Sequence, residues 1–274
     1  MNAGGIQTAP RGLLIDLDGT MYHGGRMIDG ANELIAQLRR HGIPFLFVTN
    51  NSSASPEIVA GRLSAMGIAS EAREVVTSAQ AAAAYIAART PGATVFVIGE
   101  DGLLDAVRGA GLALAASAEE PADYVLQGID RQFTYAKLAE AVNRIRAGAG
   151  FVLTNPDLLL PAENGFQPGA GSIGAAIAAS SGARPVVIGK PSSVLMDYAL
   201  DKLGVPPAGT WVVGDNLATD IAAGAAAGCA TALVLTGLTT EHNMEHYAKE
   251  AGVRPDAVFG DLRMLMEELE ARMG

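Results

Sequence analysis

Four short apolar runs in the sequence each end in polar residues whose types suit phosphate chemistry. The first run delivers Asp16 and Asp18, and the last delivers Asp215. Carboxylates from two different strands, together with an oxygen from Asp18, make a hard oxygen site of the kind that Mg²⁺ occupies with waters and a substrate phosphate. These residues therefore predict metal-assisted chemistry on a phosphorylated substrate.

The other polar residues at the ends of these runs suit the binding of the phosphate itself. Lys190 supplies a compact positive charge, and Thr49 with the backbone amides after it can hold phosphate oxygens near the start of a helix. In an open parallel sheet, ligands bind beyond the carboxyl ends of the strands, so we expect all of these residues to face one crevice. The set is completed by Asn50, Asn51, Asn216 and Asp220.

The elements that must position these residues alternate between strand and helix. Short β-branched and aliphatic runs are typical of buried strands when helical patterns separate them. Such alternation implies parallel sheets with right-handed crossovers. The sequence therefore predicts an α/β protein with a doubly wound, Rossmann-like parallel-sheet core. The predicted strands are residues 13–15, 44–48, 94–98, 124–126, 151–153, 185–188, 210–213 and 232–235, and the predicted helices are residues 32–41, 56–66, 79–89, 102–110, 135–147, 193–203 and 220–228.

Length and composition restrict the class of protein. At about 150 residues per domain, 274 residues predict two domains. Lys and Arg (19) against Asp and Glu (29) give a net charge of −10, so the chain lacks the positive field that attracts nucleic acids. The single cysteine, Cys229, excludes an internal disulfide and favours a cytoplasmic protein. No apolar stretch reaches the roughly 18 residues of a membrane span, so neither nucleic acid nor a membrane is expected as a partner.

Four motifs, taken in order, resemble those of the haloacid dehalogenase (HAD) superfamily of phosphohydrolases. They are Asp-x-Asp-Gly-Thr at 16–20, Thr-Asn at 49–50, Gly-Lys-Pro at 189–191 and Gly-Asp-Asn-x-x-x-Asp at 214–220. The segment between the second and third motifs looks like the C2-type cap of the NagD-like, or 4-nitrophenylphosphatase, branch, as in Gly128-Ile129-Asp130 and Thr154-Asn155-Pro156-Asp157. The resemblance implies a HAD core of residues 1–80 and 183–274, with an inserted smaller α/β cap of residues 81–182.

The resemblance also implies roles for the motif residues. The family's nucleophile falls on Asp16, which would form an aspartyl-phosphate, and its general acid and base falls on Asp18. Mg²⁺ would be held by the Asp16 side chain, the Asp18 backbone carbonyl and Asp215. The phosphate would be held by Thr49, Asn50, Asn51 and Lys190, with Lys190 counted among the catalytic groups, while Asp220 and Asn216 would support the metal ligands and Lys190 from behind.

This branch implies a Mg²⁺-dependent phosphatase that hydrolyses small organic phosphomonoesters, such as sugar phosphates, nucleoside monophosphates or 4-nitrophenyl phosphate. Two alternatives stay open: a phosphotransferase or mutase that uses the same intermediate, and a non-catalytic sensor of a phosphorylated metabolite. An inserted cap should restrict the site to small molecules, and a homodimer formed through the cap is a further expectation. Nothing in the sequence specifies the natural substrate.

Two other motifs match known patterns in a context that does not support them. Gly169–Gly174 fits the dinucleotide pattern G-x-G-x-x-G, but the residues before it, 163–168, are typical of a turn rather than a strand. His242 to His246 fits H-x-x-E-H, yet no third zinc ligand is evident, so we expect exposed histidines.

The segment Tyr22 to Gly25 is expected to form either a flap over the site or a plain turn.

Overall fold

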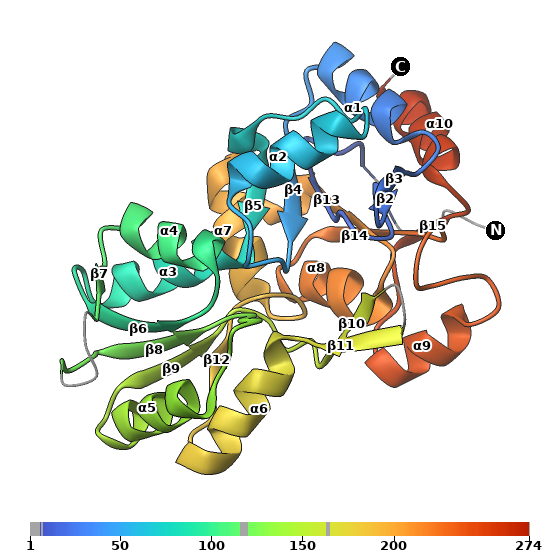
Figure 1. The fold of residues 1–274 in the computed structure, drawn as a ribbon. Helices are drawn as coiled ribbons and strands as arrows, with labels where there is room; N and C mark the ends of the chain where they lie inside the picture. Colours follow the sequence, from blue (N-terminus) through green and yellow to red (C-terminus); the bar gives the residue numbers. More distant parts are fainter. Residues whose placement is uncertain (1–5, 7, 116–119, 163–164, 274) are drawn as a thin grey trace. The chain divides into compact units, whose positions relative to one another are not determined.

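The computed structural model of the protein describes residue 6 and residues 8–115, 120–162 and 165–273. The chain divides into two compact units (Figure 1). The core unit comprises Met1–Thr49, Glu57–Val76 and Lys190–Gly274, and the inserted unit comprises Asn50–Pro56 and Thr77–Gly189. The domain limits at residues 80 and 182 that the sequence suggests stay a prediction.

The core unit is built on a parallel sheet. Its strands are β1 (Gly12–Ile15), β4 (Phe45–Thr49), β5 (Val75–Thr77), β13 (Thr210–Gly214), β14 (Ala230–Val234) and β15 (Ala257–Phe259). They lie in the order β15-β14-β13-β1-β4-β5, and β1 pairs in parallel with β4 on one side and with β13 on the other. The strand order therefore reverses at β1, which is the place where open α/β sheets bind ligands.

Continuous apolar sequence explains why the central strands of this sheet are covered on both faces. Every residue of β1, β4 and β13 is buried, as is typical of parallel strands between two layers of helices. Helix α1 (Ala31–Arg40) packs against α10 (Leu262–Met273), whereas α7 (Ser193–Leu203) packs against β1, β4 and α8 (Ala222–Ala226) (Figure 1). Along the chain, helix α2 (Pro56–Ala65) follows β4 and helix α9 (Met244–Ala251) follows β14.

The inserted unit has a parallel sheet of its own. Its elements are α3 (Ser78–Arg89), β6 (Thr94–Ile98), α4 (Asp101–Gly109), β7 (Ala113–Leu114), β8 (Tyr124–Gln127), α5 (Tyr135–Arg146), β9 (Gly150–Leu153), α6 (Ala170–Ser181) and β12 (Val186–Val187). The strands lie in the order β12-β9-β8-β6-β7 with every neighbouring pair parallel. Ile98, Val125, Phe151 and Ile177 join three of these strands to α6 in one buried cluster. The predicted fold class, a Rossmann-like core with a smaller inserted α/β unit, is confirmed.

A β-hairpin corrects one expectation from the sequence. Strand β10 (Leu159–Ala162) pairs antiparallel with β11 (Gly165–Pro168), so the expected turn before Gly169 is wrong for residues 165–168. The residues of β11 are all exposed and include Gly and Pro, which are typical of turns, so the strand depends on its pairing with β10. An antiparallel hairpin strand is still not the parallel strand that a dinucleotide fingerprint requires.

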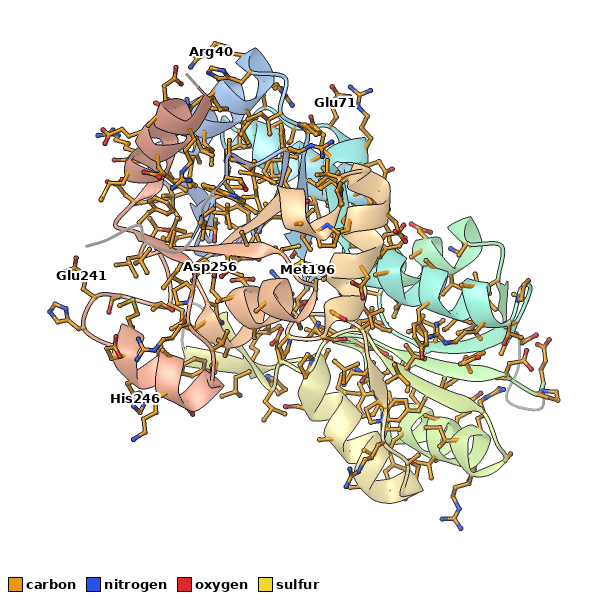
Figure 2. The ribbon with its side chains drawn as sticks, turned by 180° about the vertical axis from the view of Figure 1, so that it is seen from behind. Arg40, Glu71, Met196, Glu241, His246 and Asp256 are labelled. Carbon is orange, nitrogen blue, oxygen red and sulfur yellow. The ribbon has the colours of Figure 1, made fainter. Side chains whose placement is uncertain are left out.

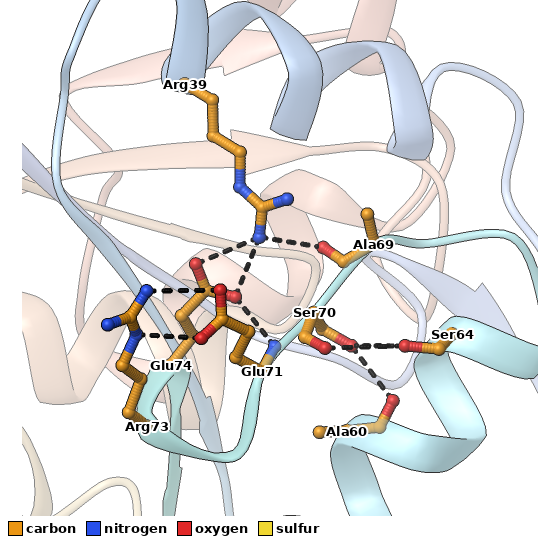
Figure 3. A network of polar contacts seen from close by, with 8 residues as sticks. All are labelled: Arg39, Ala60, Ser64, Ala69, Ser70, Glu71, Arg73 and Glu74. Atoms are coloured by element: carbon orange, nitrogen blue, oxygen red, sulfur yellow. Dashed lines mark hydrogen bonds and ion pairs between the residues drawn. The ribbon is translucent and has the colours of Figure 1, made fainter.

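A polar network fastens α1 to the segment that follows α2 (Figure 3). The Arg39 guanidinium donates to both carboxylate oxygens of Glu74 at 2.9 Å and to the Ala69 carbonyl at 3.2 Å. In the same segment, Ser70 Oγ donates to the Ala60 carbonyl of α2 at 3.0 Å. All three bonds leave one guanidinium nitrogen, Nη2, and they connect α1 to a surface loop of the core unit.

The remaining sequence expectations concern residues outside the predicted site. His242 and His246 are exposed as expected, and Figure 2 shows His246 projecting from α9 at the edge of the molecule. Cys229 is buried, as is typical of a free cysteine, and burial together with the Asp197 charge raises the pKa of its thiol to about 11. Within the described ranges, no helix has the length and apolar character needed to cross a membrane.

Candidate active site

The end of β1 places Asp16 beside β13. The Asp16 backbone N–H donates to the Val213 carbonyl at 2.9 Å, so Asp16 continues the pairing of the two strands by one residue. The chain then turns tightly, because the Leu17 carbonyl accepts from the N–H groups of Thr20, Met21 and Tyr22. Gly19 adopts a φ of 85°, and a Cβ there would lie 2.4 Å from Asp215 Oδ2. Only glycine allows this turn to pass so close to that carboxylate.

Lys190 lies between two carboxylates that follow neighbouring strands of the core sheet, Asp16 after β1 and Asp220 after β13. Its Nζ forms ion pairs with Asp16 Oδ1 and with Asp220 Oδ1, the latter at 2.7 Å, and donates to the Val48 carbonyl at 3.2 Å. Burial alone would lower the pKa of Lys190, but Asp16 and Asp220 outweigh it and raise that pKa above its usual value. The ammonium group therefore stays charged at neutral pH.

Three carboxylates converge here. The sequence analysis expected two of them, Asp16 and Asp215, at the metal site and gave Asp220 a supporting position. Oxygens of Asp16, Asp215 and Asp220 all lie within 4.8 Å of one another. Burial raises the pKa of Asp16, and the Asp220 charge raises it further while Lys190 opposes the rise. Burial and Asp220 likewise raise the pKa of Asp215 to about 6, against a hydrogen bond from the Leu238 N–H. One lysine thus faces three acidic groups, and a divalent cation fits this excess of buried negative charge.

A π-helical turn at Leu217–Ile221 positions Asp220. The Asn216 carbonyl accepts from the N–H groups of Asp220 at 2.9 Å and Ile221 at 3.3 Å, while the Asn216 side chain caps the Ala218 N–H. In return, Asp220 Oδ2 accepts from the Asn216 N–H at 3.1 Å. The predicted helix start at Asp220 is therefore wrong: the helical turn begins earlier, because Asn216 supplies the N-cap. Turns of this rare type often occur at functional sites.

The loop after β14 was not recognised in the sequence, yet it holds Asp215. The Leu238 N–H donates to Asp215 Oδ2 at 2.6 Å, and the Thr239 N–H donates to the Asp215 carbonyl at 3.2 Å. A Cβ at Gly237 would lie 2.0 Å from the same Oδ2 atom. The rule that site residues follow strand ends would have found this loop, since Thr236 and Gly237 come directly after the predicted strand 232–235.

Two further residues near the first motif contact the carboxylates: Thr20 had no role of its own in the sequence analysis, and Tyr22 had only that of a flap or turn residue. Thr20 is fully buried, and its hydroxyl donates to Asp16 Oδ2 at 3.4 Å and to Asp215 Oδ1 at 3.5 Å. The Tyr22 hydroxyl donates to Asp18 Oδ2 at 3.0 Å. Surrounding groups raise the pKa of Asp18 by displacing water, and the Tyr22 hydrogen bond opposes that rise. The two strands β2 (Tyr22–His23) and β3 (Arg26–Met27) form a hairpin here, and its action as a flap stays a prediction.

The residues expected to hold phosphate fall in both units. Thr49 is the buried last residue of β4 in the core unit, whereas Asn50 and Asn51 belong to the inserted unit. Asn50 donates to Asp157 Oδ2 at 3.2 Å. Asn51 Oδ1 accepts from the N–H groups of Ser53 and Ala54, so its side chain caps the turn before α2. Phosphate binding by these residues stays a prediction.

The chain matches two related hydrolase families. Residues 13–113 match the family described as haloacid dehalogenase-like hydrolase, and residues 187–265 match the one described as HAD-hydrolase-like. The chain is 45% identical over 260 residues to an acid sugar phosphatase of Staphylococcus saprophyticus, which covers 95% of this chain and 98% of that protein. It is 45% identical over 234 residues to the 5'-nucleotidase YutF of Bacillus subtilis, which covers 85% of this chain and 90% of that protein.

Solved structures are similar over nearly the full length. A p-nitrophenyl phosphatase from Archaeoglobus fulgidus has a TM-score of 0.90 at 37% identity, covering 95% of this chain and 99% of that chain. A 4-nitrophenylphosphatase from Thermotoga maritima has a TM-score of 0.86 at 34% identity, covering 94% and 97%. The family matches include the segments that carry Asp16, Lys190 and Asp215.

Proposed function

Because the chain belongs to the haloacid dehalogenase superfamily, in its NagD-like branch of phosphoric monoester hydrolases, we propose that it is a Mg²⁺-dependent phosphatase of small organic phosphates. The observation that carries this proposal is the convergence of Asp16, Asp215 and Asp220 around the single buried ammonium group of Lys190. Such a site suits a dianionic phosphate together with a divalent cation and would bind a neutral ligand poorly.

Asp16 is the proposed nucleophile. One of its carboxylate oxygens attacks phosphorus, the bond from phosphorus to the leaving oxygen breaks, and an aspartyl-phosphate forms. Lys190, which already contacts Asp16 Oδ1, neutralises charge on the carboxylate and on the transferring phosphoryl group. Water then attacks phosphorus and regenerates the Asp16 carboxylate with release of inorganic phosphate.

Asp18 is the proposed general acid and base. Its carboxyl proton passes to the leaving oxygen in the first step, and the resulting carboxylate takes a proton from the attacking water in the second. Asp18 is exposed, as a group that reaches a substrate must be, and its raised pKa favours the protonated form that the first step needs.

Mg²⁺ would be held by the side chains of Asp16 and Asp215 and by the Asp18 backbone carbonyl, with Asp220 and Asn216 behind them. When bound, the ion would offset the negative charge of the carboxylates and of the phosphate. The raised pKa values of Asp16 and Asp215 support this assignment, because burial and the nearby Asp220 charge both disfavour the carboxylate form, which a divalent cation would stabilise. Phosphate oxygens would contact Thr49, Lys190 and the amides of Asn50 and Asn51.

The relatives named above act on a sugar phosphate, a nucleotide or a nitrophenyl phosphate according to their names, and all three are phosphomonoesters. We propose the same range for this chain, namely sugar phosphates and nucleoside monophosphates, with 4-nitrophenyl phosphate as an artificial substrate. The phosphotransferase and sensor alternatives, a cytoplasmic location and a dimer formed through the inserted unit stay predictions from the sequence.

The decisive experiment measures phosphate release from 4-nitrophenyl phosphate by the purified protein, with Mg²⁺ and with EDTA. We expect activity with Mg²⁺, none with EDTA, and less than about 1% of wild-type turnover for Asp16→Asn, because an amide is not a nucleophile. Phosphate released without a phosphorylated acceptor separates a hydrolase from a transferase. Wild-type binding of phosphate esters without any turnover would support the sensor instead.

A further inference from the structure

The geometry points to Tyr22 as a positioning residue that fixes the orientation of the Asp18 carboxyl group, an inference that rests on the proposed function. The Tyr22 hydroxyl donates a hydrogen bond to Asp18 Oδ2 at 3.0 Å. Asp18 is exposed and directly precedes the turn formed by residues 19–21, whereas Tyr22 follows that turn and is partly buried. An exposed carboxyl group without such a partner would sample several rotamers, so the bond from Tyr22 selects one of them.

Further hydrogen bonds connect the backbone of Tyr22 to the two residues on either side of Asp18. The Tyr22 N–H donates to the Leu17 carbonyl at 3.2 Å, and the Tyr22 carbonyl accepts from the Gly19 N–H at 2.8 Å. The backbones of Tyr22 and Asp18 also pair with one another as a single β-bridge. Both the N–H and the carbonyl of Tyr22 are therefore hydrogen-bonded to residues next to Asp18. This backbone fixes the direction from which the Tyr22 hydroxyl approaches Oδ2.

The hairpin that begins at Tyr22 is anchored to the loop after β14. His23 Nε2–H donates to the Thr236 carbonyl, with 2.6 Å between nitrogen and oxygen, and Thr236 Oγ1 donates to the Gly19 carbonyl at 2.7 Å. The same loop holds Asp215 through the Leu238 N–H. Tyr22 thus begins a hairpin that is linked to the part of the core unit that presents the buried carboxylates.

The direction of the Tyr22 hydrogen bond decides which oxygen of Asp18 carries the proton. With the Tyr22 hydroxyl donating to Oδ2, the carboxyl proton of the acid form would reside on Oδ1. In the first step the Oδ1–H bond breaks and the proton passes to the leaving oxygen as that oxygen separates from phosphorus. Tyr22 therefore keeps Oδ1 available for the substrate without touching the reacting atoms.

Tyr22→Phe tests this role, because it removes the hydroxyl and keeps the ring. Proton donation matters most for poor leaving groups, so the readout is the ratio of kcat/KM for 4-nitrophenyl phosphate to kcat/KM for an alkyl phosphate. We expect this ratio to rise by about tenfold in Tyr22→Phe, as suits the loss of one hydrogen bond to an ionisable group. The loss should reside in kcat for the alkyl phosphate and leave KM nearly unchanged.

Two further variants make the test specific. Tyr198→Phe removes the hydroxyl of another partly buried tyrosine of the core unit, in α7, and should leave the ratio unchanged. In an Asp18→Asn background, which has no proton to donate, Tyr22→Phe should not change the ratio further. Melting temperatures of all variants, measured alongside, separate a loss of folded protein from a change in chemistry.

An equal loss for both substrates in Tyr22→Phe would overturn the inference, because a purely structural residue lowers both alike. A further change in the ratio on the Asp18→Asn background would overturn it as well, since Tyr22 would then act independently of Asp18. Failure of the proposed function is a different result: the wild type would not hydrolyse either ester, or Asp18→Asn would leave the ratio at its wild-type value.

Discussion

Lys190 Nζ lies 2.7 Å from Asp220 Oδ1, and both residues are almost completely buried. Breaking a buried ion pair by removing one partner leaves the other charge uncompensated. In Asp220→Asn, Lys190 loses one of the two carboxylates with which it forms ion pairs and is drawn toward Asp16, the nucleophile. We expect kcat to fall by about 10- to 100-fold, the range found when partners behind a catalytic group are lost.

The matched control for this change is Asp201→Asn, which neutralises an exposed carboxylate of α7. Steady-state kinetics with 4-nitrophenyl phosphate should show wild-type kcat for the control. A kcat for Asp220→Asn within twofold of wild type would mean that Lys190 keeps its place without the Asp220 charge.

Asp18→Asn should impair proton transfer at both chemical steps. The expected loss of kcat is about 10²- to 10⁴-fold for an alkyl phosphate and smaller for 4-nitrophenyl phosphate, whose leaving oxygen needs little protonation. A series of aryl and alkyl phosphates measures this as a steeper dependence of rate on leaving-group basicity. Identical losses along the series would remove Asp18 as the general acid.

Metal-free protein should be stabilised by Asp215→Asn near neutral pH. The pKa of Asp215 rises from 3.8 to about 6 on folding, so the folded state disfavours its charged form. The resulting destabilisation is absent below pH 4, grows as pH rises through that interval and is complete above about pH 6. Thermal unfolding in EDTA at pH 7.5 should show a melting temperature several degrees above wild type, with a smaller difference at pH 5.

Added Mg²⁺ reverses that order. A ligand that binds only the folded state raises the melting temperature in proportion to the logarithm of its concentration, so Mg²⁺ should stabilise the wild type and have little effect on Asp215→Asn. Equal stabilisation of the two proteins by Mg²⁺ would place the ion elsewhere. A lower melting temperature for Asp215→Asn in EDTA would show that the carboxylates do not repel one another.

Substrates the size of metabolites should be hydrolysed far better than phosphoproteins. The chain enters the inserted unit directly after Thr49 and leaves it directly before Lys190, two residues of the proposed phosphate site. We therefore expect the inserted unit to limit substrate size. The comparison is kcat/KM for a sugar phosphate, a nucleoside monophosphate and a phosphorylated protein at equal ionic strength. A phosphoprotein that equals the best small substrate would contradict this expectation.

The sequence predicted those strands in which several consecutive residues are apolar. Strands β1 and β13 are apolar on both faces and were located within one residue, whereas β5 and β15 have three residues each, too few for a pattern to emerge. Hairpin strand β11 was missed because its exposed residues gain their structure from β10.

Within the candidate site, the sequence located Asp16 and Asp215 because each follows a buried strand of the core sheet. It located Lys190 from the Gly-Lys-Pro motif, because the strand before it, β12, is not buried. The contact between Tyr22 and Asp18 lies in an irregular turn, where spacing along the chain does not predict which side chains meet. The bonds from the loop after β14 to Asp215 are made by backbone N–H groups, which every residue except proline possesses, so residue types there carry little signal.

Oxygen Oδ2 of Asp215 is enclosed by the backbone of Gly19 and Gly237, where a Cβ would lie 2.4 and 2.0 Å away. These glycines come from opposite ends of the chain, yet both border one atom. A chimaera between this enzyme and a relative therefore keeps its site only when the segment that contains position 19 and the segment that contains position 237 both have glycine there. Recombination, by nature or in the laboratory, therefore has to inherit the two ends of the core unit together.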